Sequence, residues 1–236
     1  MFVEKEVTGA ITGERVGKEG VYVYEGPVRL WHWVNALCIV VLAVTGYLIA
    51  SPLPSMGSGE ASEHFLMGYI RFVHFATAYV FAVALIGRIY WAFMGNHHAQ
   101  QIFTLNLTSS DWWRGMWKQM RWYLLIEPQA PKFIGHNPFG QTAAFFGFTL
   151  PSIVMIFTGF ALYSEGAQKG SWADAAFGWM IPLFGQSQTV HTWHHLGMWV
   201  IIWYVIVHFY TVIREEIMSR QSFVSPMIGG YRMFKD

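Results

Sequence analysis

Four long apolar stretches constrain the fold of this chain more than any other feature. Each is close to the roughly 20 helical residues that cross a bilayer. Charged residues make up only 12% of the chain, too few to cover the surface of a water-soluble protein of this size. We therefore predict a single all-α membrane domain, a bundle of four transmembrane helices. These helices cover about 28–50, 68–94, 141–163 and 191–213.

The composition also excludes several kinds of protein. A formal net charge of +1 gives no basic field for binding nucleic acid. A single cysteine rules out a disulfide scaffold and an iron–sulfur cluster held by this chain alone. The polar N-terminus does not resemble a cleaved signal peptide, and residues 1–23 receive no assigned role.

The distribution of Lys and Arg orients the predicted helices. The N-terminal segment, the second loop and the C-terminal tail together carry twelve basic residues, whereas the first and third loops carry only Lys169. By the positive-inside rule, both termini and the second loop lie in the cytoplasm. This arrangement predicts a multi-pass membrane protein with both termini on the cytoplasmic side.

The second loop contains a tryptophan-rich stretch in which aromatic and basic residues alternate. Asp111 is placed to cap the start of a short helix, and Pro128 would stop it. We expect this helix to lie in the cytoplasmic interface with its indole rings at headgroup depth, as an anchor without chemistry. The four indoles are Trp112, Trp113, Trp117 and Trp122.

Histidines inside the predicted spans are the strongest candidates for chemistry, because ionisable residues are costly in a membrane. His194 and His208 are 14 residues apart in the fourth span, about 40° short of four full helical turns. Both therefore point from one helix face, about 21 Å apart along the axis. The neighbouring His191 and His195 point elsewhere.

The predicted topology sorts four histidines by depth. His74 and His194 fall near the outer surface, and His32 and His208 near the inner one. Two imidazoles facing each other across a bundle are what a six-coordinate b-type haem requires. The sequence thus predicts two haem b groups, one held by the outer pair and one by the inner pair.

Three further residues fit haem binding, although each has a simpler interpretation. Gly46 follows His32 by 14 residues and would let a flat macrocycle approach, or it serves ordinary helix packing. Arg71 and Arg88 flank the second span, where they would pair with haem propionates or reach lipid phosphates. The spacing of His191, His194 and His195 would also suit zinc, but no carboxylate or thiolate nearby completes such a site.

The sequence resembles the b-type cytochrome subunit of membrane-bound, uptake [NiFe] hydrogenases from about Tyr24 to Tyr231. The most specific blocks are GHNPFGQ, TGFALYSE and HTWHHLGMW; PVRLWHW is shared more widely among bacterial di-haem cytochromes. The resemblance implies a four-helix subunit of the bacterial inner membrane, with two haems b, that anchors a hydrogenase heterodimer outside the membrane. The iron–sulfur small subunit of that hydrogenase adds a transmembrane helix beside the cytochrome, and the large subunit of the hydrogenase oxidises H2. The family's haem ligands map onto His32, His74, His194 and His208.

The resemblance also implies that electrons leave the inner haem for a membrane quinone. His136 and Asn137, in GHNPFGQ at the cytoplasmic start of the third span, are candidates for contacting the quinone carbonyls. The alternative is structural, because Asn-Pro is typical of a helix start.

Three other functions remain open from the sequence. The cytochrome subunit of a formate dehydrogenase or thiosulfate reductase would share the fold, the haems and the topology. A small metal or proton transporter would use the histidines as ligands, although no Asp or Glu lies within the predicted spans. A pure membrane anchor with no haem is the simplest alternative.

Overall fold

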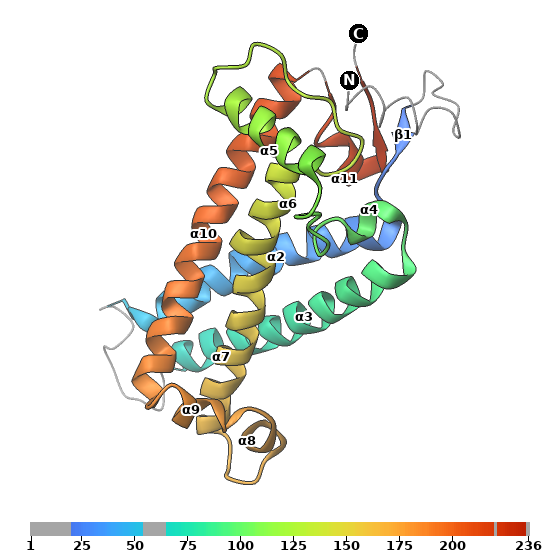
Figure 1. Ribbon diagram of the computed structural model, residues 1–236. Coiled ribbons are helices and arrows are strands. Elements are labelled where there is room, and N and C mark those ends of the chain that lie inside the picture. The colour runs from blue at the N-terminus through green and yellow to red at the C-terminus, as the bar shows by residue number, and fades with distance from the viewer. Residues whose placement is uncertain (1–19, 54–64, 220, 235–236) are drawn as a thin grey trace. The chain divides into compact units, whose positions relative to one another are not determined.

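The computed structural model describes residues 20–53, 65–219 and 221–234 and is almost entirely helical (Figure 1). Four long apolar helical segments can each cross a membrane: Gly26–Ala50, Leu66–Met94, Pro138–Gly166 and Ser187–Met218. The prediction of an all-α protein with four membrane spans is confirmed, and the chain is a multi-pass membrane protein. Each helix extends beyond its predicted bounds by two to five residues on at least one side.

The first unit of the fold is the hairpin of α2 (Gly26–Ala50) and α3 (Leu66–Met94). The two helices pack along each other within this unit. We call the end where α2 stops and α3 starts the connected end of the hairpin, and the opposite end the open end. Most large apolar side chains of both helices are exposed, as expected of helices surrounded by lipid.

The second unit contains residues 20–25 and 95–234 of the described chain. Its membrane hairpin pairs α10 (Ser187–Met218) with a long segment made of α6 (Pro138–Ala144), the π-helix η2 (Phe145–Thr149) and α7 (Leu150–Gly166). Two short helices, α8 (Trp172–Phe177) and α9 (Met180–Leu183), join α7 to α10 at the connected end (Figure 1). Ala161, Met180 and Val190 form a small apolar core there.

The π-helix has a cause in the sequence. Pro151, just after η2, has no N–H to donate, and its ring would clash with the carbonyl of Gly147 in a regular helix. The wider turn before it is closed by the N–H of Leu150, which donates to the carbonyl of Phe145.

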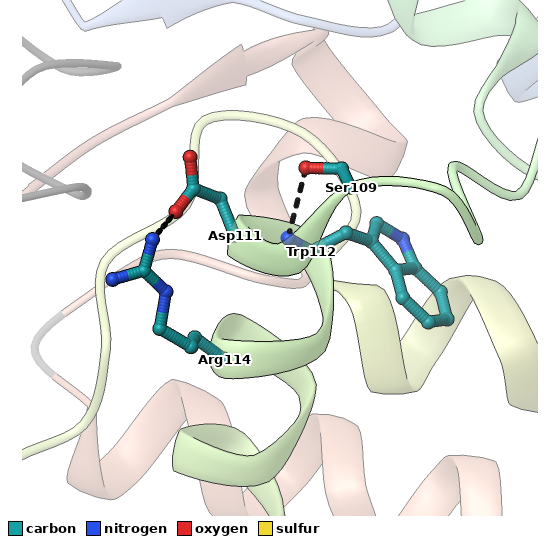
Figure 2. A network of polar contacts seen from close by, with 4 residues as sticks. All are labelled: Ser109, Asp111, Trp112 and Arg114. Atoms are coloured by element: carbon teal, nitrogen blue, oxygen red, sulfur yellow. Dashed lines mark hydrogen bonds and ion pairs between the residues drawn. The ribbon is translucent and has the colours of Figure 1, made fainter.

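The helix expected in the second loop is α5 (Ser110–Tyr123). Ser109 caps it by accepting a hydrogen bond from the N–H of Trp112 at 3.3 Å, and Asp111 in the first turn pairs with Arg114 (Figure 2). Trp113 and Trp117 are exposed, but Trp112 and Trp122 are buried inside the protein. Only two of the four indoles are therefore free to reach a membrane interface.

Short elements surround the open end of the second hairpin. They are β1 (Val21–Tyr22), α4 (His97–Gln100), α11 (Ser225–Gly229) and β2 (Tyr231–Arg232), with β1 and β2 paired antiparallel. Gly230 turns the chain from α11 into β2 at φ +88°, where a side chain would collide with the Tyr24 carbonyl. Asn96 caps α4 and donates its side-chain N–H to the carbonyl of Val23.

Candidate haem-binding site

All four candidate ligands lie within the long helices, and each imidazole is half-buried. His32 lies near the open end of the first hairpin and His74 near its connected end. His194 and His208 lie on one uninterrupted helix, α10, near the connected and open ends of the second hairpin. Each hairpin therefore carries one candidate ligand toward either end.

His74 is held by a threonine of the neighbouring helix. Its Nδ1 lies 2.8 Å from Oγ1 of Thr45 in α2. That hydroxyl donates its own proton to the carbonyl of Val41, 2.6 Å away. Since a hydroxyl has a single proton, it can only accept from the imidazole, so Nδ1 carries the hydrogen. In the neutral imidazole the other ring nitrogen, Nε2, then keeps its lone pair.

His194 repeats this arrangement in the second hairpin. Its Nδ1 lies 2.8 Å from Oγ1 of Thr158 in α7, and that hydroxyl donates to the carbonyl of Val154 at 2.7 Å. Gly159 makes room for the ring, because a Cβ at this position would lie 3.1 Å from Cε1 of His194. Nε2 of His194 is again the nitrogen left with its lone pair.

His208 is positioned differently. Its ring stacks on Tyr204, one turn earlier in α10, with centroids 5.7 Å apart and planes 14° from parallel. Tyr204 in turn stacks on Phe148 of the π-helix and passes over Gly147. A Cβ at Gly147 would come within 2.7 Å of the Tyr204 ring, so this glycine permits the close approach.

The structure separates the two candidate arginines. Arg71 is exposed near the start of α3. Arg88 is almost fully buried at the open end of the first hairpin, with its guanidinium 5.3 Å from the Trp31 ring centroid. Because Trp31 precedes His32, Arg88 and His32 belong to the same end of the hairpin. Gly46 directly follows Thr45 in α2.

The quinone candidates, His136 and Asn137, lie just before α6. The side chain of Asn137 caps this helix by accepting from the N–H of Gly140, so the structural interpretation of Asn-Pro holds. Nδ1 of His136 lies 3.2 Å from the Tyr24 hydroxyl. The carbonyls of residues 133–135 all accept hydrogen bonds from Arg232, whose guanidinium is buried. Burial lowers the pKa of Arg232.

Sequence reasoning missed a buried polar cluster beside this loop. Gln119 of α5 donates to the Glu215 carboxylate of α10 at 2.6 Å, and the Tyr123 phenol hydrogen-bonds to the same carboxylate. Burial and the nearby Glu215 charge raise the pKa of Tyr123. Arg214 donates to the last carbonyls of α5, at Trp122 and Tyr123.

The donor set fits haem iron better than other metals. In the described part of the chain, no three His, Cys, Asp or Glu side chains gather to hold a metal ion. His195, a member of the alternative zinc triad, instead accepts a hydrogen bond at Nε2 from the Trp199 indole. Two histidines whose Nδ1–H is hydrogen-bonded, leaving Nε2 available, are what axial ligation by imidazole requires.

Comparison with known proteins agrees with this fit. The four spans define a multi-pass membrane protein, and the family match makes it one of the b-type cytochrome class. Residues 23–230 match the profile of the prokaryotic cytochrome b561 family. The chain belongs to this family, and membership implies haem b binding.

Close relatives cover nearly the whole chain. A "Probable Ni/Fe-hydrogenase B-type cytochrome subunit" of Azotobacter chroococcum mcd 1 is 56% identical over 237 residues, covering 100% of this chain and 98% of the relative. The Cupriavidus necator protein of the same name is 58% identical over 92% of this chain and 89% of its own length. A "Probable Ni/Fe-hydrogenase 1 B-type cytochrome subunit" of Escherichia coli (strain K12) is 49% identical, with 91% of each covered.

Proposed function

We propose that this chain is the haem b subunit that anchors a [NiFe] hydrogenase in the inner membrane and passes electrons from H2 oxidation to quinone. The names of its relatives support a Ni/Fe-hydrogenase as partner. The proposed partners within that enzyme are its iron–sulfur small subunit and its H2-oxidising large subunit. The observation that carries the haem-binding part is the repeated Thr–His contact. In each hairpin this contact binds Nδ1 of one histidine near the connected end and leaves its Nε2 available as a ligand.

Two haem b groups are proposed, one held by His74 and His194 and the other by His32 and His208. When bound, haem would supply one-electron transfer. The chain's own residues hold and orient the imidazoles of these histidines: Thr45 and Thr158 through Nδ1, and Tyr204 by stacking on His208. Arg71 and Arg88 are the proposed propionate partners, with Arg88 kept at its end of the hairpin by Trp31.

The proposed orientation places both termini and α5 in the cytoplasm. The support is the excess of Lys and Arg in those segments over the first and third loops. The connected ends of both hairpins then face outward, toward the hydrogenase. The variants Ser51→Cys and Lys169→Cys, each in a Cys38→Ser background, test this orientation with a membrane-impermeant thiol reagent. Both cysteines should be labelled in intact cells. Labelling that occurs only when the reagent has access to the cytoplasmic side would contradict the proposed orientation.

Replacing the four histidines one at a time by alanine tests the ligand assignment. Haem per chain, measured as pyridine hemochromogen in the purified complex, should be two for the unchanged protein. His74→Ala and His194→Ala should remove the same spectral component, and His32→Ala and His208→Ala the other. His195→Ala is the matched control, because His195 neighbours His194 but bonds to Trp199; it should keep both haems. Retention of both haems in His74→Ala would refute the assignment.

His136 is the proposed contact for quinone. It lies beside the Tyr24 hydroxyl, and the Arg232-bound loop of residues 133–135 leads directly into it. An imidazole and a phenol side by side can donate to a quinone carbonyl and deliver a proton to it. Asn137 is the second proposed contact, although its side-chain oxygen is already used to cap α6.

A further inference from the structure

The Thr45–His74 and Thr158–His194 contacts are two copies of the same local arrangement. α2 and α7 each carry Thr-Gly followed by an aromatic residue, at Thr45-Gly46-Tyr47 and Thr158-Gly159-Phe160. In both hairpins the threonine lies in the first long helix and its histidine in the second, near the connected end. Both Oγ1–Nδ1 distances are 2.8 Å. Two independent hairpins therefore hold one histidine each in the same way.

Both threonines are buried, so the imidazole of each histidine depends on the threonine hydroxyl as its hydrogen-bond acceptor. Thr45 is 8% exposed and Thr158 fully buried, so water does not replace the hydroxyl as a partner for the imidazole. Each hydroxyl is itself fixed by its bond to the carbonyl one turn earlier. The acceptor that the imidazole meets is thus held in one position, and the ring cannot rotate without losing its hydrogen bond.

We propose that Thr45 and Thr158 are positioning residues that act on one and the same haem, through the two histidines that would hold it. This rests on the proposed function, in which His74 and His194 share a haem. An acceptor on Nδ1–H makes an imidazole a stronger electron donor to the metal at Nε2. Stronger donation stabilises ferric over ferrous iron, so the two hydroxyls lower the midpoint potential of this haem.

The chemistry of the open end differs. The ring of His208 stacks on Tyr204, and His208 is proposed to hold the other haem, with His32. A change at Thr45 or Thr158 should therefore leave the haem of His32 and His208 unaffected. The two threonines provide a way to shift the potential of one haem alone.

Redox titration of the purified complex, followed at the haem absorption bands, tests the proposal. Thr45→Val and Thr158→Val keep the side-chain shape and remove the acceptor. The titration should show two one-electron steps, and both valine variants should affect the same step. Each should favour the reduced form of that haem by roughly tenfold, which raises its midpoint potential by about 59 mV. Thr45→Ser and Thr158→Ser keep a hydroxyl and should restore the original potential. The low-spin ferric electron paramagnetic resonance signal of that haem should change with it.

The controls separate this inference from the proposed function. Thr142→Val removes a hydroxyl that also donates to a carbonyl one turn earlier, at Pro138, and it should shift neither step. If His74→Ala and His194→Ala lose a haem but both valine variants titrate like the unchanged protein, the positioning role is wrong and the ligand assignment stands. Shifts in two different steps would show that the threonines do not serve one haem. If the histidine variants keep both haems, the proposed function itself fails.

Discussion

The ring of Tyr204 lies within 14° of parallel to the imidazole of His208 and is itself wedged over Gly147 of the π-helix. Pro151 causes the wider π-helical turn at Phe145–Thr149. This turn contains Gly147, which has no side chain and therefore leaves room for the Tyr204 ring. An irregularity in one helix thus determines where a histidine of the other helix is packed. Such π-turns are frequent at functional sites.

Gly147→Ala should disturb this packing. The new methyl group would lie 2.7 Å from the Tyr204 ring and force that ring, on which His208 stacks, to move. We expect a loss of about 1–3 kcal/mol in stability, typical of overpacking, and a reduced content of the haem proposed at His32 and His208. Thermal unfolding and haem content of the complex measure both effects. Gly166→Ala, near the other end of α7 in open space, is the control and should change neither.

Stability at alkaline pH should depend on Tyr123. Its pKa is raised by burial and by Glu215, so the folded state keeps a proton that the unfolded state loses above about pH 10. The free energy of unfolding is therefore unaffected below that pH and decreases as the pH rises further. Tyr123→Phe should weaken the protein at neutral pH, through the lost bond to Glu215, and flatten this decrease. Equal slopes in thermal unfolding between about pH 9 and 11 for both proteins would contradict the account.

Arg232 should stabilise the loop that precedes His136. One buried nitrogen, Nη1, lies 2.6–3.0 Å from the carbonyl oxygens of Phe133, Ile134 and Gly135, which share its two hydrogens. Arg232→Ala leaves these acceptors without their donor, at about 1–3 kcal/mol for each group that stays buried. Limited proteolysis should then cut the 133–135 segment faster, with haem content unchanged. Arg114→Ala is the comparison, since its ion pair with Asp111 is exposed and contributes little (Figure 2).

His136→Ala tests the proposed quinone contact. H2-driven reduction of a soluble quinone analogue by the purified complex should decrease, while both haem spectra and their reduction by dithionite stay as they are. Thr104→Val, which removes an exposed hydroxyl bonded to the Gln100 carbonyl, should leave turnover intact. Undiminished quinone turnover in His136→Ala would remove this residue from the quinone site.

The sequence predicted the spans because hydropathy and helix length are local properties. It ended the fourth span near Ile213, where charged residues begin, yet α10 continues to Met218. The extra turn forms because Glu215 and Arg214 find partners on α5, which hydropathy cannot reveal. The burial of Trp112 has the same kind of cause, as its indole donates to Gln141 of α6.

The candidate site was predictable only in part. Histidine spacing within a span identified the four ligand candidates, because helix geometry fixes which side chains share a face. Thr45 and Thr158 were missed, because a threonine in a membrane helix ordinarily donates to a backbone carbonyl one turn earlier and does not indicate a functional site. Their role depends on which histidine the neighbouring helix brings within 2.8 Å. The repeated Thr-Gly-aromatic pattern was the one local signal that could have indicated them.

The central claim is that this chain carries two haems that accept electrons from a hydrogenase. Its most direct test is a reduced-minus-oxidised absorption spectrum of the purified membrane complex, with haem counted per chain and H2 added in place of dithionite. The account predicts two b-type haems per chain, both reduced by H2. Reduction by dithionite alone would assign the cytochrome to another dehydrogenase, such as a formate dehydrogenase or thiosulfate reductase. The absence of haem would contradict the account and leave a transporter or a simple anchor.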